Sequence, residues 1–370
     1  MAGLRGATIE EVVAQAWVVP TDEPEADGTL TWDSTTVVLV EVKAAGQTGL
    51  GWTYGHASAA HLVNDKLGDL VVGREAADVP AANLAMVRAV RNMGRRGIAS
   101  TAISAVDIAL WDLKARLLDV PLAVLLGKVR DSIPAYGSGG FTTWDDARLR
   151  EEIGGWTEAG MRAVKIKIGE DAGANVARDL HRTALATRTA GPGIEVFVDA
   201  NGGYSRGQAA RMGAALDNLG VTWFEEPVTS DDLQGLHELR TRLQCDVSTG
   251  EYAWCPEDAQ RLIEAGAVDC LQADVTRCEG VTGWLRVAAL ADAAALDVST
   301  HCAPQLSAHV AVAVPNARHI EWFHDHVRLD PMLVEGTLDV VDGTVTPDLS
   351  RPGHGMRLRA KPAEPARRVA

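Results

Sequence analysis

Hydrophobic positions along the first third of the chain predict strands followed by helices. Residues 8–55 contain a β-branched run at 37–42, and the turn residues Gly46 and Gly49 precede a second apolar segment. Residues 57–118 carry apolar positions at helical spacing, most regularly toward the end of that segment. Strands followed by helices are typical of an α+β domain.

The pattern changes near residue 132, where short apolar runs begin to alternate with helical segments. Eight candidate strands follow, spaced mostly 23–33 residues apart, which is the rhythm of a βα barrel. They begin at Ile133, Ala163, Glu195, Thr222, Asp246, Asp269, Val298 and His319. An open, doubly wound sheet is the alternative. The glycine turns at 137–140 and 191–193 nevertheless lack the strand–GxGxxG–helix context of a dinucleotide site.

These patterns predict an α/β protein in three parts. We expect an α+β domain over 1–125, a barrel over 126–335 and a tail over 336–370. The tail begins with a hairpin-like segment that could return to the first domain, and its last ten residues are expected to fray.

Composition narrows the functional classes. Apolar residues make up 46% and charged residues 23% of the 370 residues, as in a well-packed soluble protein. No stretch approaches the roughly 18 apolar residues of a membrane span, and the start lacks the apolar core of a secretory signal, so we expect a cytoplasmic protein. Five cysteines without a CxxC pair favour free thiols over disulfides or structural zinc.

The charge balance disfavours nucleic-acid and membrane partners. The formal net charge is −15, which repels phosphate backbones and anionic lipid surfaces. A site for an anionic ligand would therefore need a bound cation and inward lysines to reverse the local field.

Two lysines in one predicted strand are the first candidates for chemistry. Lys165 and Lys167 are two residues apart, so they share one face of the strand, while Val164 and Ile166 share the other. Ammonium groups inside a barrel are costly unless they are used, which favours a proton-transferring pair. A solvated lysine face on an edge strand is the alternative.

Three acids each follow one of the predicted strands. Asp199, Glu225 and Glu251 are 26 residues apart in turn, about one βα unit each. Successive barrel strands would then deliver three carboxylates to the C-terminal rim. Such carboxylates repel one another unless a cation joins them, and oxygen-only ligands favour Mg²⁺ or Mn²⁺ over zinc. Any one of the acids alone would be an ordinary rim residue.

A histidine and two further acids complete the predicted rim. His301 follows one strand and Asp274 the strand before it, so the carboxylate could orient the imidazole and raise its basicity. Glu321 ends the next strand and could donate a hydrogen bond to a substrate oxygen if it is kept protonated. A structural histidine and a salt-bridged rim acid are the alternatives.

Together these motifs resemble the mandelate racemase subgroup of the enolase superfamily. The matching elements are Lys165-x-Lys167, Asp199-Ala-Asn201, Glu225-Glu226-Pro227, Gly250-Glu251, Asp274 and His301, with Glu321 downstream. Their order and spacing match over about 160 residues. The resemblance implies an α+β capping domain on a modified (β/α)7β barrel, with the C-terminal tail rejoining the cap. Family members are commonly homo-oligomers.

The resemblance also implies roles for these residues. Asp199, Glu225 and Glu251 would hold Mg²⁺, with Mn²⁺ as an alternative, which binds a substrate carboxylate and stabilises the enediolate formed when the α-proton leaves. Lys167 and His301 would flank the α-carbon. Lys165 would assist Lys167 and the metal.

One departure from the wider family bears on the reaction. Relatives that resemble muconate cycloisomerase or dipeptide epimerases carry a lysine after the sixth strand, where this chain has Asp274. The Lys-x-Lys and His–Asp combination resembles acid-sugar dehydratases, which convert a sugar acid to a 2-keto-3-deoxy acid. Racemisation or epimerisation of a 2-hydroxy acid is the second possibility. A metal-dependent aldolase and a catalytically idle binding barrel are the rivals.

Substrate specificity in this family is set by loops of the cap. Here these would be 21–32, whose polar, Gly/Pro-containing sequence suits a mobile lid, and 52–56. The candidate substrate-binding residues are Trp32, Tyr54, His56, Tyr136, Ser138 and Asn201.

Overall fold

Three long antiparallel strands form the sheet of the N-terminal part. A computed structural model describes residues 6–370; residues 1–5, the start of the predicted first domain, lie outside the described residues. The strands are β1 (Glu11–Ala26), β2 (Thr31–Ala44) and β3 (Gln47–Tyr54). The β-branched run of β2 pairs with both neighbours, and its valines form part of the buried core.

Helices cover one face of this sheet. They are α1 (Ser58–Leu62), the π-helical turn η1 (Val63–Leu67), α2 (Gly68–Val71), α3 (Val79–Ala89), α4 (Ile98–Leu117) and α5 (Leu122–Leu125). Helix α4 lies directly against β3, because Gly49 and Gly51 have no side chains to hold the two backbones apart. The predicted order of strands followed by helices is confirmed.

Eight parallel strands then form a closed barrel, as the spacing predicts. They are β4 (Ile133–Gly139), β5 (Ala163–Lys167), β6 (Glu195–Asp199), β7 (Val221–Glu225), β8 (Asp246–Thr249), β9 (Cys270–Ala273), β10 (Asp297–Thr300) and β11 (Ile320–Phe323). Strands β4 to β10 pair in sequence order and β11 pairs with β4. A bridge between Val298 of β10 and Ala317, three residues before β11, connects the last two strand segments. The predicted TIM-like α/β barrel with an additional N-terminal domain is confirmed.

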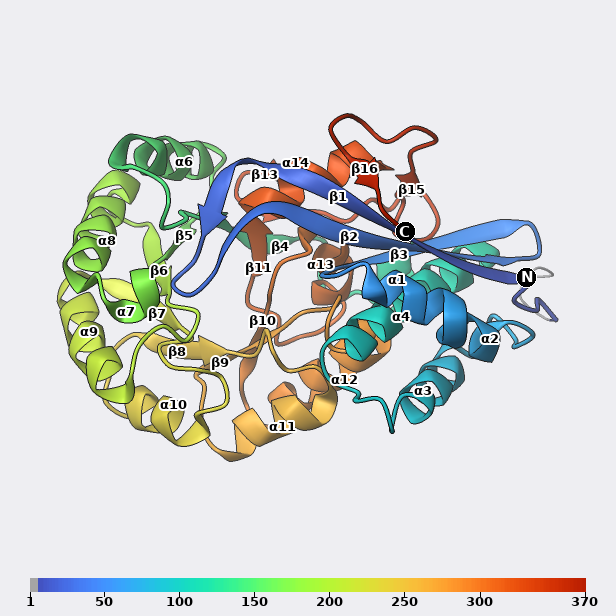
Figure 1. Cartoon of the computed structure of the whole chain (residues 1–370), viewed down its shortest axis with the longest axis horizontal. Helices are drawn as coiled ribbons and strands as arrows, with labels where there is room; N and C mark the ends of the chain where they lie inside the picture. Colours follow the sequence, from blue (N-terminus) through green and yellow to red (C-terminus); the bar gives the residue numbers. More distant parts are fainter. Residues whose placement is uncertain (1–5) are drawn as a thin grey trace.

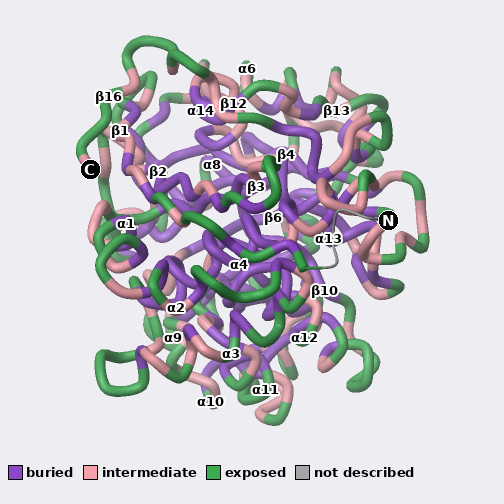
Figure 2. Tube along the Cα trace, turned by 90° about the vertical axis from the view of Figure 1, so that its right-hand side faces the viewer, coloured by how far each residue is buried: buried purple, intermediate pink, exposed green. Residues whose placement is uncertain are grey.

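The connecting helices lie outside the barrel (Figure 1). They are α6 (Asp146–Glu158), α7 (Glu170–Gly173), α8 (Val176–Ala190), α9 (Arg206–Asn218), α10 (Leu233–Arg240), α11 (Pro256–Glu264), α12 (Gly280–Ala293), α13 (Pro304–Ala311) and, after β11, α14 (His324–Leu333). Seven strand–helix units followed by an eighth strand make the (β/α)7β order. Buried segments run through the centre of the molecule around α4 and β6, with exposed segments at the periphery (Figure 2).

The β1–β2 hairpin extends from the N-terminal helices across the barrel (Figure 1). Its tip is hydrogen-bonded to the loop after β4 and to the short helix α7 after β5. The Thr142 N–H donates to the Ala26 carbonyl at 2.8 Å, and the Ala172 N–H donates to the Gly28 carbonyl at 2.8 Å. The segment 21–32, expected to be a loop, is therefore mostly strand, and only its tip is a turn.

The C-terminal tail contacts both parts of the molecule. It follows β12 (Val334–Glu335) and contains β13 (Val340–Val341), β14 (Thr344–Val345), β15 (Arg357–Leu358) and β16 (Arg367–Arg368). The β13–β14 hairpin joins β4 of the barrel, whereas β16 pairs with β1 of the N-terminal sheet. The expectation that the last ten residues fray is wrong, because the edge of β1 offers them free backbone hydrogen-bonding groups.

Two features of the whole chain match its composition. All five cysteines are buried and free. Within residues 6–370, none of the helices combines the length and apolar character that a membrane crossing requires.

Candidate active site

Strand β5 places its two lysines inside the barrel, as its alternation predicts. Val164 and Ile166 belong to the main hydrophobic core, while Lys165 and Lys167 meet carboxylates. Nζ of Lys165 lies 2.6 Å from Oε1 of Glu225 and is fully buried. Nζ of Lys167 pairs with Oδ2 of Asp199.

Strand register brings the predicted acids to one level of the barrel. Lys167 is the register partner of Asp199, and Asp199 is that of Glu225. Glu251 follows β8 by two residues. One carboxylate oxygen from each of Asp199, Glu225 and Glu251 lies within 4.8 Å of the others, and all three residues are buried.

This donor set fits a hard divalent cation. Three buried carboxylates converge, and the only side-chain nitrogen within ion-pair distance of Oε2 of Glu251 among the described residues is Nε2 of His301, at 3.2 Å. Each acid also faces a base of the chain, since Lys165 contacts Glu225, Lys167 contacts Asp199 and Arg277 contacts Glu251 at 3.1 Å. The same carboxylates can therefore exchange these partners for a metal ion without being left as bare buried charges.

His301 and Asp274 form the predicted pair. Nδ1 of His301 lies 2.8 Å from Oδ2 of Asp274. The other oxygen of Asp274 accepts hydrogen bonds from the N–H and the hydroxyl of Thr276, both at 2.7 Å. The carboxylate is thus fixed from both sides and sets the orientation of the ring, which leaves Nε2 facing Glu251 at 3.2 Å.

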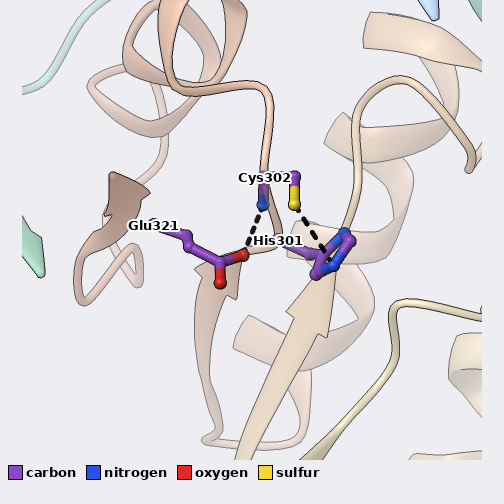
Figure 3. Close-up of side chains that lie close together, drawn as sticks. All are labelled: His301, Cys302 and Glu321. Carbon is purple, nitrogen blue, oxygen red and sulfur yellow. Dashed lines mark hydrogen bonds between the residues drawn. The ribbon is translucent and has the colours of Figure 1, made fainter. Parts of the chain in front are cut away.

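Cys302 and Glu321 lie beside this ring (Figure 3). Sγ of Cys302 is 3.4 Å from Nε2 of His301, and the Cys302 N–H donates to Oε2 of Glu321 at 2.6 Å. Oε1 of Glu321 accepts from the Ser138 hydroxyl at 2.6 Å and from Lys165 at 2.7 Å.

Glu321 was expected to donate a hydrogen bond to a substrate oxygen only if it is protonated, and its surroundings do not favour that form. Burial alone would raise the pKa of Glu321, but the charge of Lys165 outweighs it and holds that pKa below its usual range. With its oxygens occupied as acceptors, Glu321 anchors Lys165 and the backbone after β10.

The lysines and the histidine are held in their charged forms by the surrounding acids. Burial alone would lower the pKa of Lys165 and of Lys167, but the carboxylates of Glu225 and Asp199, respectively, raise them. Burial would likewise lower the pKa of His301, but its neighbours, Glu251 and Asp274 among them, raise it well above its usual range.

A cavity of about 310 Å³ opens between the barrel rim and the β1–β2 hairpin. Lys167, Asn201, Glu251, His301 and Glu321 line its barrel side. Asn201 is one of the expected substrate-binding residues, and its side-chain oxygen is buried without a hydrogen-bond partner. Lys165, Asp199, Glu225 and Asp274 lie behind these residues and contact them or one another.

Two other expected substrate-binding residues also line the cavity. The Trp32 indole N–H donates to Glu25 at 2.8 Å, so its ring forms part of the wall. The Tyr54 hydroxyl donates to Asp330 at 2.7 Å, and its ring stacks on His326 with 3.4 Å between centroids.

Three further expectations differ from the structure. Tyr136 lies deeper in the barrel, packed on Phe197 and lining a separate cavity, because it sits two residues before the rim position of β4. Ser138 is buried against Glu321. His56 is exposed and contacts the Ser58 hydroxyl at 2.7 Å, outside the cavity.

Several cavity residues were not anticipated from the sequence. Arg277 lies 3.3 Å from Asp274 as well as contacting Glu251. Tyr252, Cys302, Asp325 and His326 also line the cavity. Tyr252 and Cys302 directly follow two of the predicted rim residues, which is the one sequence signal that could have indicated them.

Comparison with known families covers nearly the whole chain. Residues 10–127 match the family described as mandelate racemase / muconate lactonizing enzyme, N-terminal domain. Residues 148–362 match the family described as enolase C-terminal domain-like.

Curated relatives include two named enzymes of sugar-acid metabolism. L-talarate/galactarate dehydratase from Salmonella typhimurium is 30% identical over 317 residues, which cover 83% of this chain and 77% of the relative. 3,6-anhydro-alpha-L-galactonate cycloisomerase from Streptomyces coelicolor is 32% identical over 321 residues, which cover 85% of this chain and 86% of the relative.

Solved structures agree over a similar length. A mandelate racemase/muconate lactonizing enzyme-like protein from Rubrobacter xylanophilus superposes with a TM-score of 0.92 at 45% identity, covering 95% of this chain and 97% of that one. A racemase from Streptomyces coelicolor A3(2), solved with bound magnesium, has a TM-score of 0.89 at 30% identity, and the match covers 95% of this chain and 97% of that one. Taken with the two family matches, these similarities show that the chain belongs to the mandelate racemase subgroup of the enolase superfamily.

Proposed function

We propose that the chain is a magnesium-dependent lyase that removes water from a sugar acid to give a 2-keto-3-deoxy acid. The observation that carries this proposal is that an amine, Lys167, and an imidazole, His301, line one cavity together with Glu251, whose carboxylate converges with two others directly behind the cavity wall. The dehydratase among the relatives supports the same reaction class.

The carboxylates of Asp199, Glu225 and Glu251 would hold the metal ion. When bound, a divalent cation would neutralise the substrate carboxylate, stabilise the negative charge that develops as the α-proton leaves, and lower the pKa of Lys167. Magnesium suits this all-oxygen donor set and occurs in a related structure.

Lys167 is the proposed base for the α-proton. It reaches the cavity, whereas Lys165 is buried behind it between Glu225 and Glu321. The fixed charge of Lys165 would favour the neutral form of Lys167 once the carboxylates are engaged elsewhere, and it would also help to hold the substrate anion.

His301 is the proposed acid for the departing hydroxyl. Asp274 holds Nδ1, and the surrounding carboxylates favour the protonated ring, so Nε2 carries the proton that can be donated. The α-carbon loses its proton to Lys167, and the β-carbon loses its hydroxyl, which leaves as water with the proton from His301. The remaining enol then converts to the 2-keto acid.

The three segments would divide this work. We propose that residues 1–125 cap the site and contact the far end of the substrate, and that 126–335 carry the metal ligands and proton carriers. Residues 336–370 would tie the two together, in keeping with the pairing of β16 with β1 and of β14 with β4.

Racemisation or epimerisation of a 2-hydroxy acid is the second candidate. Two proton carriers lining one cavity suit it, because one could remove the α-proton and the other return it from the opposite face. The magnesium-containing racemase relative supports this alternative.

A product screen separates these reactions. Sugar acids are incubated with the enzyme and Mg²⁺ in D₂O and analysed by mass spectrometry and NMR. We expect wild type to remove one water and form a 2-keto acid. In His301→Asn the rate of 2-keto acid formation should fall by at least about 100-fold. α-Deuterium incorporation with inversion and no water loss would instead identify a racemase or epimerase, and a 2-keto isomer formed without loss of water would identify a cycloisomerase.

A further inference from the structure

The two sides of the cavity differ in charge. On the barrel side, Lys167 and Arg277 supply positive charge next to the carboxylate cluster. The opposite side is formed by the β1–β2 hairpin and the β11–α14 corner. Among the described residues that line the cavity, this opposite side contributes no lysine or arginine.

What the opposite side does contribute is hydroxyl groups and carboxylates. Ser34, Thr35 and Thr36 of β2 line it, and the Thr35 hydroxyl donates to Asp325, while Asp27 and Asp325 contribute acids from the hairpin tip and the β11–α14 corner. His326 lies among them, and burial lowers its pKa to about 3, so it adds no positive charge near neutral pH.

Asp325 is fixed in place by two partners. One carboxylate oxygen accepts from the Thr35 hydroxyl, and the other accepts from the Arg328 guanidinium at 2.5 Å. Arg328 approaches from outside the cavity and also donates to the Pro20 carbonyl at 2.9 Å. Its charge is thus matched to Asp325 and leaves no surplus for a ligand anion.

The pKa of a buried acid, Glu25, indicates whether this region of the protein can accommodate a further negative charge. Glu25 is fully buried, bonds the Trp32 indole and has its other oxygen unpartnered. Burial and the nearby charge of Asp325 raise the pKa of Glu25 to about 8, against the weaker opposing effects of Trp32 and His324. The wall around Trp32 therefore disfavours an additional carboxylate.

We infer that the cavity selects acid sugars whose far end is a neutral hydroxymethyl group, that is aldonic acids, over the matched dicarboxylic aldaric acids, and that Asp325 is the residue that enforces this choice. The inference rests on the proposed function, which places the reacting carboxylate at the metal-ligand side. The sugar hydroxyls then donate to Asp325 and exchange hydrogen bonds with Thr35 and its neighbours. A second carboxylate at that end would meet Asp27 and Asp325, with no lysine or arginine among the described lining residues of that side to receive it and with Arg328 already paired to Asp325.

The test compares stereochemically matched pairs such as gluconate with glucarate and galactonate with galactarate. Specificity is measured as kcat/KM for 2-keto acid formation with Mg²⁺. We expect the best aldonate to exceed its matched aldarate by at least about 100-fold. Asp325→Asn keeps the shape of the side chain but removes its charge. It should lower that ratio about tenfold by raising kcat/KM for the aldarate.

Two further variants guard against indirect effects. Asp27→Asn retains the oxygen that accepts hydrogen bonds from Thr29 and Leu30, so it should fold and should also narrow the ratio. Asp33→Asn removes one charge from an exposed position of the same hairpin outside the cavity and should leave the ratio unchanged.

The outcomes separate this inference from the proposed function. Equal or better turnover of the aldarate would overturn the inference while leaving dehydration intact. If neither acid is dehydrated, the proposed function fails, and the same pairs are then compared through the rise in Tm that each causes with Mg²⁺. A larger rise with the aldonate supports the selectivity, whereas an equal or larger rise with the aldarate overturns it.

Discussion

At the residue level, a buried acid without a charged partner makes the stability of this protein depend on pH. Asp107 of α4 is fully buried and accepts hydrogen bonds from the Thr282 N–H at 2.9 Å and from Asn83 at 3.0 Å. No cation contacts it among the described residues, and Glu279 adds a further negative charge nearby. Burial raises the pKa of Asp107 to about 7 despite these hydrogen bonds.

This shift predicts that Asp107 lowers stability as the pH rises. Between roughly pH 4 and pH 7 the folded state keeps the proton that the unfolded state has lost, so the free energy of unfolding falls by up to about 1.4 kcal/mol per pH unit. Above pH 7 both states are ionised and the loss levels off. Asp107→Asn should therefore gain stability relative to wild type from pH 5 to pH 7.

Urea unfolding at several pH values measures that difference. The exposed Asp33→Asn provides the control and should show a difference that does not change with pH. A flat difference for Asp107→Asn as well would show that Asp107 is already ionised in the folded protein at pH 5.

The same scale explains which site residues the sequence could indicate. Lys165, Lys167 and Asp199 follow from the two-residue period of a strand and from its end, which are local properties. Tyr136 also faces the barrel interior, but its depth along β4 places it below the rim, next to Phe197 and Trp223. The two-residue period of a strand predicts which face a side chain is on, but not how far it lies from the barrel rim. The expectation that Tyr136 is a substrate-binding residue was wrong for this reason.

At the scale of elements, the contact between β3 and α4 depends on two glycines. A Cβ on Gly51 would lie 2.2 Å from the Ala105 carbonyl oxygen and 2.5 Å from the Ala109 nitrogen. Both are backbone atoms of a long buried helix and cannot move aside cheaply. This close contact fixes β3 and, with it, Tyr54 in the cavity wall.

Gly51→Ala is therefore expected to destabilise the fold by at least about 1–3 kcal/mol, the usual cost of overpacking. Gly154→Ala is the matched control, because its Cβ would have no neighbour within 4 Å and the residue lies inside helix α6. The control should stabilise the protein by about 0.5–1 kcal/mol. Urea unfolding of both variants checks the prediction. Similar changes in the free energy of unfolding for the two variants would contradict the tight contact between β3 and α4.

At the scale of the whole molecule, paired charges decide how the fold depends on metal. The carboxylate cluster is balanced by Lys165, Lys167 and Arg277, so the chain can fold without an ion. A ligand that binds the folded state alone adds about 2.7 kcal/mol at a concentration one hundred times its Kd. We therefore expect Mg²⁺ to raise Tm by several degrees over EDTA-treated protein.

Glu225→Gln should abolish that rise, because it removes one of the three charged ligands. Glu264→Gln, at an exposed position of α11, should retain the full response to Mg²⁺. Thermal scans with and without Mg²⁺ give the measurement. A full response in Glu225→Gln would mean that the ion binds elsewhere.

The homo-oligomer and the cytoplasmic location expected from the sequence both stay predictions. A sizing measurement of the purified protein would test the first.

Local sequence patterns were enough to predict the architecture and the end of the barrel at which the chemistry lies. Strand spacing indicated eight barrel strands, and the residues that end them indicated the carboxylates, the lysines and the His–Asp pair. These predictions succeed because each depends on a short segment: strand period, strand end and the spacing of one βα unit are all encoded within about thirty residues.

The surroundings of those groups, in contrast, follow from contacts between segments that are far apart in the sequence. Asp325 faces Thr35 across 290 positions of sequence, and Arg277 reaches both Glu251 and Asp274. The return of β16 to β1 likewise joins opposite ends of the chain. Such contacts depend on how separate elements close upon one another, and no local pattern encodes that distance. The identity of the ligand depends on them for the same reason, because the far wall of the cavity is assembled from the hairpin and the last barrel strand together.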